Sequence, residues 1–460
     1  WNKECYASDY FEQLYNWALV LIEKDLAYID SQSSEDIANQ KGTPTKEGKA
    51  SPHRDRDKEE SLKVFKEMYN GEHKQGEHVL RAKINMSSPN MLMRDPVIYR
   101  VMDSNHHRTG DRWKIYPMYD WTHGESDYIE QVSHSLCTLE FEPHRELYDW
   151  FLDSISPLEG IRPKQREFSR LNLSYTITSK RNLAKLVEEG VVDGWDDPRM
   201  PTISGLRNRG YTPESLKSFA LTVGISKREN VIDVSLLEFC VRTHLNEEAP
   251  RAMAVLDPLK ISIINYNENK EESVNFDINP QKPGQGKREI LFSKNIYIER
   301  EDFQENPEEG FFRLSPGEEV RLKNAYIIKA KNIIKNEEGQ ITEVECEYDE
   351  KSKSGSNTEE SNRKVKATIH WVSAETAVEA TINIYDRLFK VPEPGKSQDL
   401  LSEVNENSLE IKSAKVEPYL ASAKDGDHFQ FQRSGYFVRT NNKKTLEFNK
   451  TVGLRDGRKK

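Results

Sequence analysis

After Pro250 the sequence alternates apolar and polar residues with a period of two, and turn signals such as Asn336-Glu-Glu-Gly339 interrupt the alternation. Successive side chains of a strand point to opposite faces, so this pattern predicts half-buried β-strands. Many short strands over roughly 200 residues favour barrels. The alternation is clearest at residues 320–322, 344–348, 365–371, 429–431 and 436–438. The polar segment 349–364 is expected to be a mobile hairpin loop inside this region.

The chain before Pro250 mixes helical and strand patterns. Helical spacing of apolar residues predicts helices near 11–22 and 62–69 and through most of 182–248, and strands are expected at 79–84 and 97–101. Residues 32–60 are polar and rich in turn formers, which predicts extended loops. A strand from Ile115 that carries Tyr119 and Asp120 into a helix would suit an open α/β sheet.

Composition excludes several classes of protein. A length of 460 residues predicts about three or four domains. No apolar run approaches the roughly 18 residues of a membrane helix, so we expect a cytoplasmic protein with no membrane partner. Cys5, Cys137, Cys240 and Cys346 have no paired spacing, which predicts neither a disulfide framework nor a metal site. With a net charge of -10, binding of RNA would require local clusters of basic residues.

The stretch from Phe168 to Arg181 carries the pattern most suggestive of chemistry. An apolar alternation from Leu171 to Ile177 predicts a strand, which ends in Thr178-Ser-Lys-Arg181 before helical spacing resumes. Backbone N–H groups at a helix start, a hydroxyl and an ammonium together favour the charge of reacting phosphates. A solvated helix cap is the alternative interpretation of such a triplet.

The same stretch resembles a known family. Residues 165–210 resemble the signature-loop region of class I aminoacyl-tRNA synthetases, and Ile177-Thr-Ser-Lys-Arg181 resembles their Lys-Met-Ser-Lys-Ser loop in the form that glutaminyl-tRNA synthetases use. The segment Gly194-Trp-Asp-Asp-Pro-Arg-Met-Pro-Thr-Ile-Ser-Gly-Leu-Arg207 is similar to these enzymes and to glutamyl enzymes of eukaryotic type. The resemblance extends over nearly the whole chain.

The resemblance implies a fold of the α/β plus all-β class in four parts. Residues 1–114 would hold an insertion that binds the acceptor end of tRNA, and residues 115–181 the second half of a Rossmann-type catalytic fold with the signature loop. Residues 182–248 would form a helical subdomain, and residues 249–460 two anticodon-binding β-barrels. The family's first half-fold, with its His-Ile-Gly-His motif for ATP, is expected to precede Trp1, because none of the eleven histidines lies in such a motif. We therefore expect this fragment alone to be inactive.

The resemblance also implies roles for individual residues of the catalytic part. Lys180 and Ser179 would be catalytic, and the ATP site would comprise Arg170, Leu171, Thr178, Ser179 and Lys180. Glutamine would be bound by Tyr119, His123, Cys137 and Gln165. From sequence alone, Tyr119 and His123 could equally be buried structural polar residues.

Contacts with tRNA are implied at both ends of the chain. Pro89 would touch the second base pair of the acceptor stem, while the loop at Pro44 corresponds to a wedge that is leucine in the best-known members; a plain turn proline is the alternative. Anticodon contacts would come from Asn246, Arg251, Arg313, Arg321, Lys323, Gln430 and Arg433. A strand with one buried and one solvent-exposed face also explains the alternation around Gln430.

The implied activity is ATP-dependent ligation of glutamine to its cognate tRNA, with Mg²⁺ accompanying ATP, by a monomer. Two alternatives remain open. A glutamyl-tRNA synthetase of eukaryotic type would carry arginine at the Cys137 position, where its charge meets a substrate carboxylate. A non-catalytic tRNA-binding fragment is the second alternative.

Overall fold

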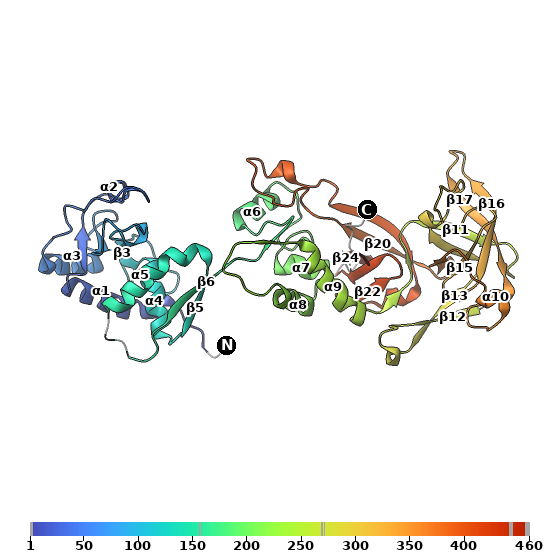
Figure 1. Ribbon diagram of the computed structural model, residues 1–460, viewed down its shortest axis with the longest axis horizontal. Coiled ribbons are helices and arrows are strands. Elements are labelled where there is room, and N and C mark those ends of the chain that lie inside the picture. The colour runs from blue at the N-terminus through green and yellow to red at the C-terminus, as the bar shows by residue number, and fades with distance from the viewer. Residues whose placement is uncertain are drawn as a thin grey trace. The chain divides into compact units, whose positions relative to one another are not determined.

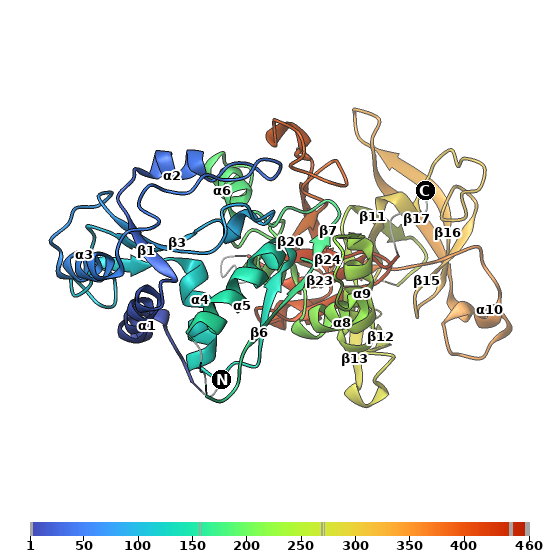
Figure 2. The same ribbon diagram turned by 60° about the vertical axis from the view of Figure 1, so that its left-hand side comes forward.

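The computed structural model describes residues 3–155, 157, 159–267, 270, 272–440 and 445–455. The chain divides into two compact units. The first unit comprises Trp1–Arg170 and Ile225–Glu229, and the second comprises Leu171–Gly224 and Asn230–Lys460. Figures 1 and 2 show the two units from two directions.

The first unit surrounds a four-stranded antiparallel sheet of order β1-β2-β3-β4. Its core combines buried residues of this sheet with those of α1, α3, α4 and α5. The strands are β1 (Ala27–Asp30), β2 (Val79–Ala82), β3 (Val97–Val101), β4 (Ile115–Pro117), β5 (His134–Thr138) and β6 (Lys164–Phe168). The helices are η1 (Ala7–Tyr10), α1 (Phe11–Glu23), α2 (Ser34–Gln40), α3 (Lys58–Asn70), η2 (Met91–Met93), α4 (Tyr119–Ile129), η3 (Leu139–His144) and α5 (Arg145–Ser154).

Most of the predicted elements of this unit are present. The helices near 11–22 and 62–69 and the strands at 79–84 and 97–101 are confirmed as α1, α3, β2 and β3. Helix α3 has clear end signals: the Asp57 carboxylate accepts the N–H groups of Glu59 and Glu60, and Gly71 ends the helix in the left-handed region at φ 79°. The prediction of loops throughout 32–60 was wrong at α2, because the Ser33 hydroxyl accepts the N–H of Asp36 and caps a short helix.

The strand at Ile115 lies in a different sheet from the one predicted. It forms β4 and pairs antiparallel with β3, and Tyr119 is already the first residue of α4. The parallel pairing expected of an open α/β sheet occurs instead between β5 and β6, where Ser135 faces Gln165 and Cys137 faces Glu167. This pair carries Cys137 and Gln165, two of the four side chains that the sequence assigned to the amino-acid site.

The second unit begins with a helical part. It contains β7 (Asn172–Leu173), α6 (Lys180–Glu188), α7 (Ile203–Arg209), α8 (Pro213–Val223), β8 (Val231–Ile232) and α9 (Val234–Glu248). The helical interpretation of 182–248 is thereby confirmed. The strand predicted from Leu171 to Ile177 is wrong beyond Leu173, because Tyr175 adopts a left-handed backbone at φ 58° and donates its N–H to Pro392 rather than to a neighbouring strand.

Two seven-stranded sheets follow, as the period-two alternation predicted. We call them the first barrel, of order β18-β15-β16-β17-β11-β14-β19, and the second barrel, of order β10-β21-β20-β24-β23-β22-β9. Each surrounds its own buried core. The first barrel and its flanking hairpin contain β11 (Pro258–Ile263), β12 (Glu272–Asp277), η4 (Pro283–Gln285), β13 (Lys287–Phe292), β14 (Asn295–Glu299), η5 (Arg300–Asp302), β15 (Glu319–Leu322), β16 (Ile327–Lys335), β17 (Ile341–Asp349), η6 (Glu350–Ser352), α10 (Glu359–Asn362), β18 (Thr368–Ile369) and β19 (Val372–Ser373).

The second barrel takes its first strands from residues that precede the first barrel. It contains β9 (Arg251–Ala252), β10 (Ala254–Val255), β20 (Val378–Tyr385), η7 (Leu401–Glu403), β21 (Leu409–Val416), η8 (Pro418–Ser422), β22 (His428–Phe431), β23 (Gly435–Arg439) and β24 (Glu447–Val452). The segment 349–364 is more structured than the hairpin loop we predicted. It includes η6 and α10, and Arg321 donates to the carbonyl oxygens of Ser352 and Ser361.

Two further observations concern the described residues as a whole. All four cysteines are free. None of the described helices is both long and apolar enough to cross a membrane.

Candidate active site and RNA-binding surfaces

Tyr119, His123, Cys137 and Gln165 lie on neighbouring elements of the first unit, and we call them the α4–β6 group. The ring of Tyr119 lies 5.2 Å from that of His123, one turn further along α4. His123 Nε2 lies 2.9 Å from the hydroxyl of Ser135 on β5. Cys137 is two residues further along the same strand, so its side chain points to the same face as that of Ser135.

The amide of Gln165 has a fixed orientation. Its Nε2 donates to the carbonyl oxygen of Phe141 at 2.9 Å and to Glu167 Oε1 at 2.8 Å. Its Oε1 atom is buried and has no hydrogen-bond partner among the described residues. A buried acceptor without a donor costs free energy, so this oxygen is a position at which a bound N–H group would be stabilised.

Glu167 neutralises the guanidinium that reaches this group. Arg145 donates to both carboxylate oxygens of Glu167, with Nε 3.0 Å from Oε1. Burial alone would raise the pKa of Glu167, but the hydrogen bonds from Arg145 and Gln165 outweigh it and hold the pKa below its usual range. The pair is therefore ionised and internally balanced at neutral pH.

The remaining titratable side chains of the group are uncharged at neutral pH. Burial lowers the pKa of His123, and burial raises the pKa of the Cys137 thiol. Burial and the neighbouring Cys137 also raise the pKa of Tyr119. The group thus combines a hydroxyl, a neutral imidazole, a thiol and an amide oxygen, and the Asp127 carboxylate lies 3.3 Å from His123 Nε2. This setting offers no cation to a substrate carboxylate and suits an uncharged polar side chain.

Sequence reasoning missed Ser135, Arg145 and Glu167. One signal was available for Glu167, because it follows Gln165 by two residues and so shares its face of a strand. The contact of Arg145 with Glu167 joins α5 to β6, and no periodic pattern in the sequence predicts it because the two residues are far apart along the chain.

The signature segment 177–181 lies in the second unit. Ile177 is buried in a cluster with Leu183 and Leu186 of α6 and with Leu388 and Phe389 of the connection between β20 and β21. That connection also places the guanidinium of Arg387 over the Tyr175 ring, 4.3 Å from its centroid. The segment is therefore anchored just before the residues predicted to meet phosphate.

Thr178, Ser179 and Lys180 are exposed where α6 begins. The Ser179 side chain does not cap the helix, so its hydroxyl and the first N–H groups of α6 remain accessible. Leu171 is also exposed. Arg170, which ends the main stretch of the first unit, lies with its Nε 3.7 Å from the Glu140 carboxylate at the surface.

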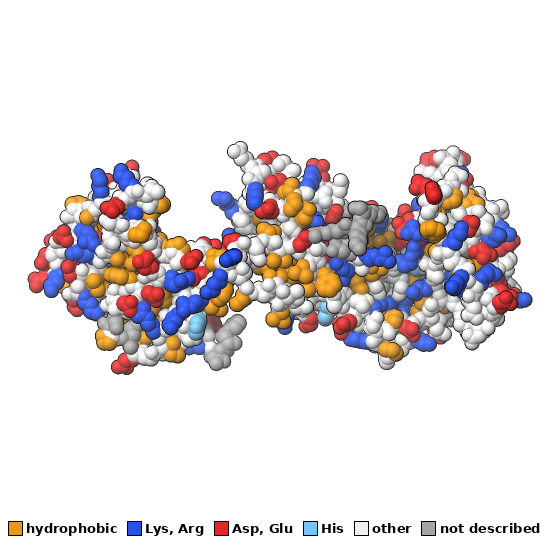
Figure 3. Space-filling model, viewed as in Figure 1, with side chains coloured by type: hydrophobic (Ala, Val, Ile, Leu, Met, Phe, Trp, Pro, Cys, Tyr) orange, Lys and Arg blue, Asp and Glu red, His pale blue; other side chains and the backbone are white. Residues whose placement is uncertain are grey.

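A hollow of about 510 Å³ lies beside the signature segment in the second unit. Residues of the segment line it together with basic side chains of the helical part and the second barrel: Arg199, Arg209, Arg242, Arg387, Lys450 and Arg455. On the face shown in Figure 3, basic and acidic side chains are interspersed. Glu238 and Asp386 also line the hollow, so six basic side chains outnumber two carboxylates, and this balance suits a phosphate backbone.

Asp197, in the Trp-Asp-Asp-Pro-Arg motif, holds the turn that follows α6. Its buried carboxylate accepts from the Arg199 guanidinium at 3.0 and 2.7 Å and from the backbone N–H groups of Asp193 and Arg199. Burial alone would raise the pKa of Asp197, but these hydrogen bonds outweigh it and lower the pKa below its usual range.

Replacing Asp197 by asparagine is expected to lower the free energy of unfolding by about 2–3 kcal/mol at pH 7, because the Arg199 charge loses its buried partner. A lowered folded-state pKa stabilises above the unfolded pKa of about 3.9, and this contribution disappears as pH falls through the folded-state value. Urea unfolding should therefore separate Asp197→Asn from the original protein at pH 7 and bring them together at strongly acidic pH. Asp196→Asn, at the exposed neighbouring carboxylate, is the control; an equal loss there would contradict the assignment.

Pro44 and Pro89, the predicted acceptor-stem residues, line the same surface hollow of the first unit, of about 560 Å³. The amide of Asn90 fixes this edge by donating to the carbonyl oxygen of Pro143 and to the Glu146 carboxylate. The fold thus brings both prolines together, while the wedge role of Pro44 stays a prediction.

The predicted anticodon residues fall into three groups in the second unit. Asn246, Arg251 and Gln430 meet through strand pairing and through hydrogen bonds with each other and with Tyr436. Arg313 and Arg433 both pair with the buried Asp302. Arg321 lies on β15, and Lys323 directly follows the end of that strand. Arg251 is 5% exposed and donates to the backbone of Ala249 and Asn246, so it supports the fold where the sequence suggested a base contact.

Comparison with known families agrees with this architecture. Residues 1–247 match the catalytic domain of the class I tRNA synthetases (E and Q), and residues 249–349 and 368–440 each match an anticodon-binding domain of the same enzymes. A catalytic part followed by two barrels that match anticodon-binding domains defines a class I tRNA synthetase.

Curated relatives narrow this class. The chain is 51% identical over 460 residues to the glutamine–tRNA ligase of Vibrio parahaemolyticus, covering 99% of this chain and 82% of that protein. It is 51% identical to the glutamine–tRNA ligase of Cronobacter sakazakii (98% and 81% covered) and 49% identical to that of Clostridium kluyveri (99% and 82% covered). The chain belongs to the class I tRNA synthetase family for glutamate and glutamine.

Proposed function

We propose that the chain ligates glutamine to its cognate tRNA. Glutamine would react with ATP to form glutaminyl-adenylate, and the glutaminyl group would then pass to the terminal ribose of the tRNA. Mg²⁺ would enter with ATP, bound to its phosphate oxygens. Family membership and the relatives named glutamine–tRNA ligase support this activity.

The orphaned Oε1 of Gln165 supports glutamine over glutamate. A glutamine side chain offers an amide N–H to this acceptor, and a glutamate carboxylate offers none. The balanced Arg145–Glu167 pair leaves no uncompensated guanidinium to attract a carboxylate. Tyr119 and Cys137 complete a neutral group, with the Tyr119 hydroxyl available as a donor to the substrate carbonyl.

No side chain needs to act as a nucleophile in this reaction, since positioning and electrostatic stabilisation carry it. The Lys180 ammonium and the N–H groups at the start of α6 would stabilise the charge that develops on the pyrophosphate leaving group. The basic hollow beside the signature segment would receive part of the tRNA backbone. We propose the four-part division at residues 114, 181 and 248 for these tasks, in a cytoplasmic monomer.

Charging of tRNA with radiolabelled glutamine and glutamate tests the proposal. A site that bonds one donor and acceptor pattern can reject its near-isostere by about 10⁴ to 10⁵. We expect preference for glutamine of that order in the complete protein, with ATP consumed in proportion. Comparable charging with glutamate would identify a glutamyl enzyme, and tRNA binding without charging by either amino acid would favour a non-catalytic binding protein.

Gln430 and Arg251 should differ in how their loss affects tRNA. Gln430 is partly exposed and makes one long hydrogen bond, 3.4 Å to Tyr436, so Gln430→Ala should weaken tRNA binding by about 1–3 kcal/mol through loss of a base contact. Arg251→Ala should instead lower thermal stability, because its guanidinium is bonded to buried backbone. Filter binding and melting temperature, measured on both variants, distinguish these outcomes. Weaker binding and lower stability in both variants would give Gln430 a structural role only.

A further inference from the structure

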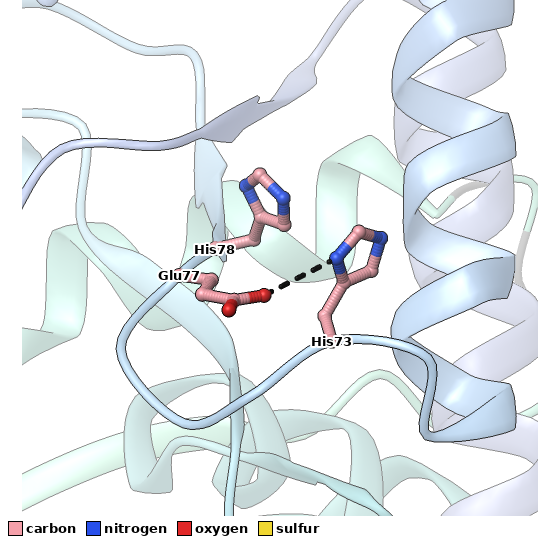
Figure 4. A group of neighbouring side chains, drawn as sticks. All are labelled: His73, Glu77 and His78. Atoms are coloured by element: carbon pink, nitrogen blue, oxygen red, sulfur yellow. Dashed lines mark ion pairs between the residues drawn. The ribbon is translucent and has the colours of Figure 1, made fainter.

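Two histidines and a glutamate converge in the loop between α3 and β2 of the first unit. Figure 4 shows His73, Glu77 and His78 facing one another across this loop. Each side chain offers one ligand atom, and these three atoms lie within 4.8 Å of one another. The two imidazole rings are 4.5 Å apart and nearly perpendicular. The loop contains none of the residues assigned above, so the site is additional to the proposed function.

The loop holds the Glu77 side chain in place. The backbone N–H of Lys74 donates to Glu77 Oε2 at 3.0 Å, and the N–H of Glu77 donates to the carbonyl oxygen of Lys74. Gly76, at φ 90°, supplies the left-handed residue that this turn requires. The Glu77 carboxylate is therefore positioned before any ligand arrives.

A second carboxylate orients His73. Its Nε2 lies 3.2 Å from Glu67 Oε2 on the last turn of α3, while its Nδ1 lies 3.5 Å from Glu77 Oε2. A proton on Nε2, shared with Glu67, leaves the lone pair of Nδ1 directed towards Glu77. Carboxylate–histidine pairs of this kind commonly orient the imidazole ligands of metal ions.

His78 has a corresponding partner. Its Nδ1 lies 2.9 Å from the hydroxyl of Ser31. That hydroxyl accepts a hydrogen bond from Arg56 at 3.0 Å, so it can also accept the Nδ1 proton of His78 and leave Nε2 free as a ligand. Arg56 also forms an ion pair with Glu60, whose Oε1 lies 3.4 Å from Arg56 Nε, and this carboxylate offsets the positive charge of Arg56 beside the site.

We propose that His73, Glu77 and His78 bind a divalent transition-metal ion, with Zn²⁺ as the best fit. Two imidazoles and one carboxylate match the ligands of Zn²⁺ and not the all-oxygen sets of Mg²⁺ or Ca²⁺. Around a tetrahedral Zn²⁺ ion, the ligand atoms lie about 3.4 Å from one another. The three ligand atoms here lie within 4.8 Å of one another, so each pair needs to approach by about 1.5 Å at most to bind the ion. Water fills the fourth position. The ion would link the end of α3, through Glu67, to the start of β2.

Calorimetric titration of tag-free, chelator-treated protein with ZnCl₂ tests this site. We expect one equivalent of Zn²⁺ to bind with a micromolar dissociation constant, and MgCl₂ to give no binding. His78→Gln should weaken Zn²⁺ binding at least 100-fold by removing a ligand. Glu67→Gln should weaken it about 10- to 100-fold, since it only orients His73.

His107→Gln is the matched control, because His107 is an exposed histidine of the same unit that adjoins another histidine, His106. Its affinity for Zn²⁺ should equal that of the original protein. Circular dichroism of each variant without metal checks that the first unit is folded. Absence of the one-equivalent binding, or equal affinity of the original protein and folded His78→Gln, would overturn the proposal.

Discussion

Replacing Cys137 by arginine in the complete protein is expected to lower kcat/KM for glutamine by about 100-fold or more and to raise it for glutamate. Glutamine and glutamate are nearly isosteric, so the shape of the site cannot discriminate between them. Discrimination must come from the charge and the hydrogen-bond pattern of the site. The α4–β6 group is neutral, and Cys137 contributes to this by withholding positive charge. An arginine there would place a guanidinium where only a carboxylate could neutralise it.

The fold adds a competitor that the sequence did not reveal. Cys137 is paired with Glu167 across β5 and β6, so the new guanidinium can also reach that carboxylate and displace Arg145. Either arrangement adds one uncompensated positive charge to the group. The switch in specificity should therefore occur whichever arginine keeps the ion pair.

Cys137→Ser is the control for size without charge, and it should keep the preference for glutamine. Tyr119→Phe should weaken glutamine use without conferring glutamate use, because it removes a donor and adds no charge. If Cys137 were only a small buried hydrophobe, arginine would depress charging with both amino acids and lower the melting temperature. That combined loss would reject the specificity role.

Lys180→Ala is expected to lower glutamine-dependent ATP–pyrophosphate exchange by about 10²- to 10³-fold, measured in the complete protein with tRNA present. Removing one preorganised group that stabilises transition-state charge typically has this effect. Lys180 is exposed at the start of α6, so the substitution should leave the melting temperature unchanged. The KM for glutamine should change much less than kcat.

Lys185→Ala is the matched control, since Lys185 is an exposed lysine of the same helix. It should retain normal exchange. Similar losses in both variants would indicate that general positive charge, and not a positioned ammonium, supports the reaction.

Local pattern was sufficient for much of the fold. The helical spacing of apolar residues within Phe11–Glu23 and Lys58–Asn70 predicted helices correctly, and the alternation after Pro250 predicted the barrel strands, because periods of 3.6 and 2 follow directly from backbone geometry. The signature segment was also visible, because its residues are consecutive. Spacing failed at Tyr175, where a left-handed residue ends a strand that the apolar alternation alone would continue.

Other features depend on contacts between residues far apart in the chain. The spacing of the cysteines gave no indication of a metal site. The contacts of Ser31 and Glu67 with the histidines of the loop before β2 arise only in the folded chain. Likewise Arg145 neutralises Glu167, and Arg251 is buried by the backbone around it. The sequence by itself determined the family pattern, the periodic elements and the residues of the signature segment. Tertiary structure decided charge balance, burial and free hydrogen-bond acceptors, because these depend on which distant groups replace water around each side chain.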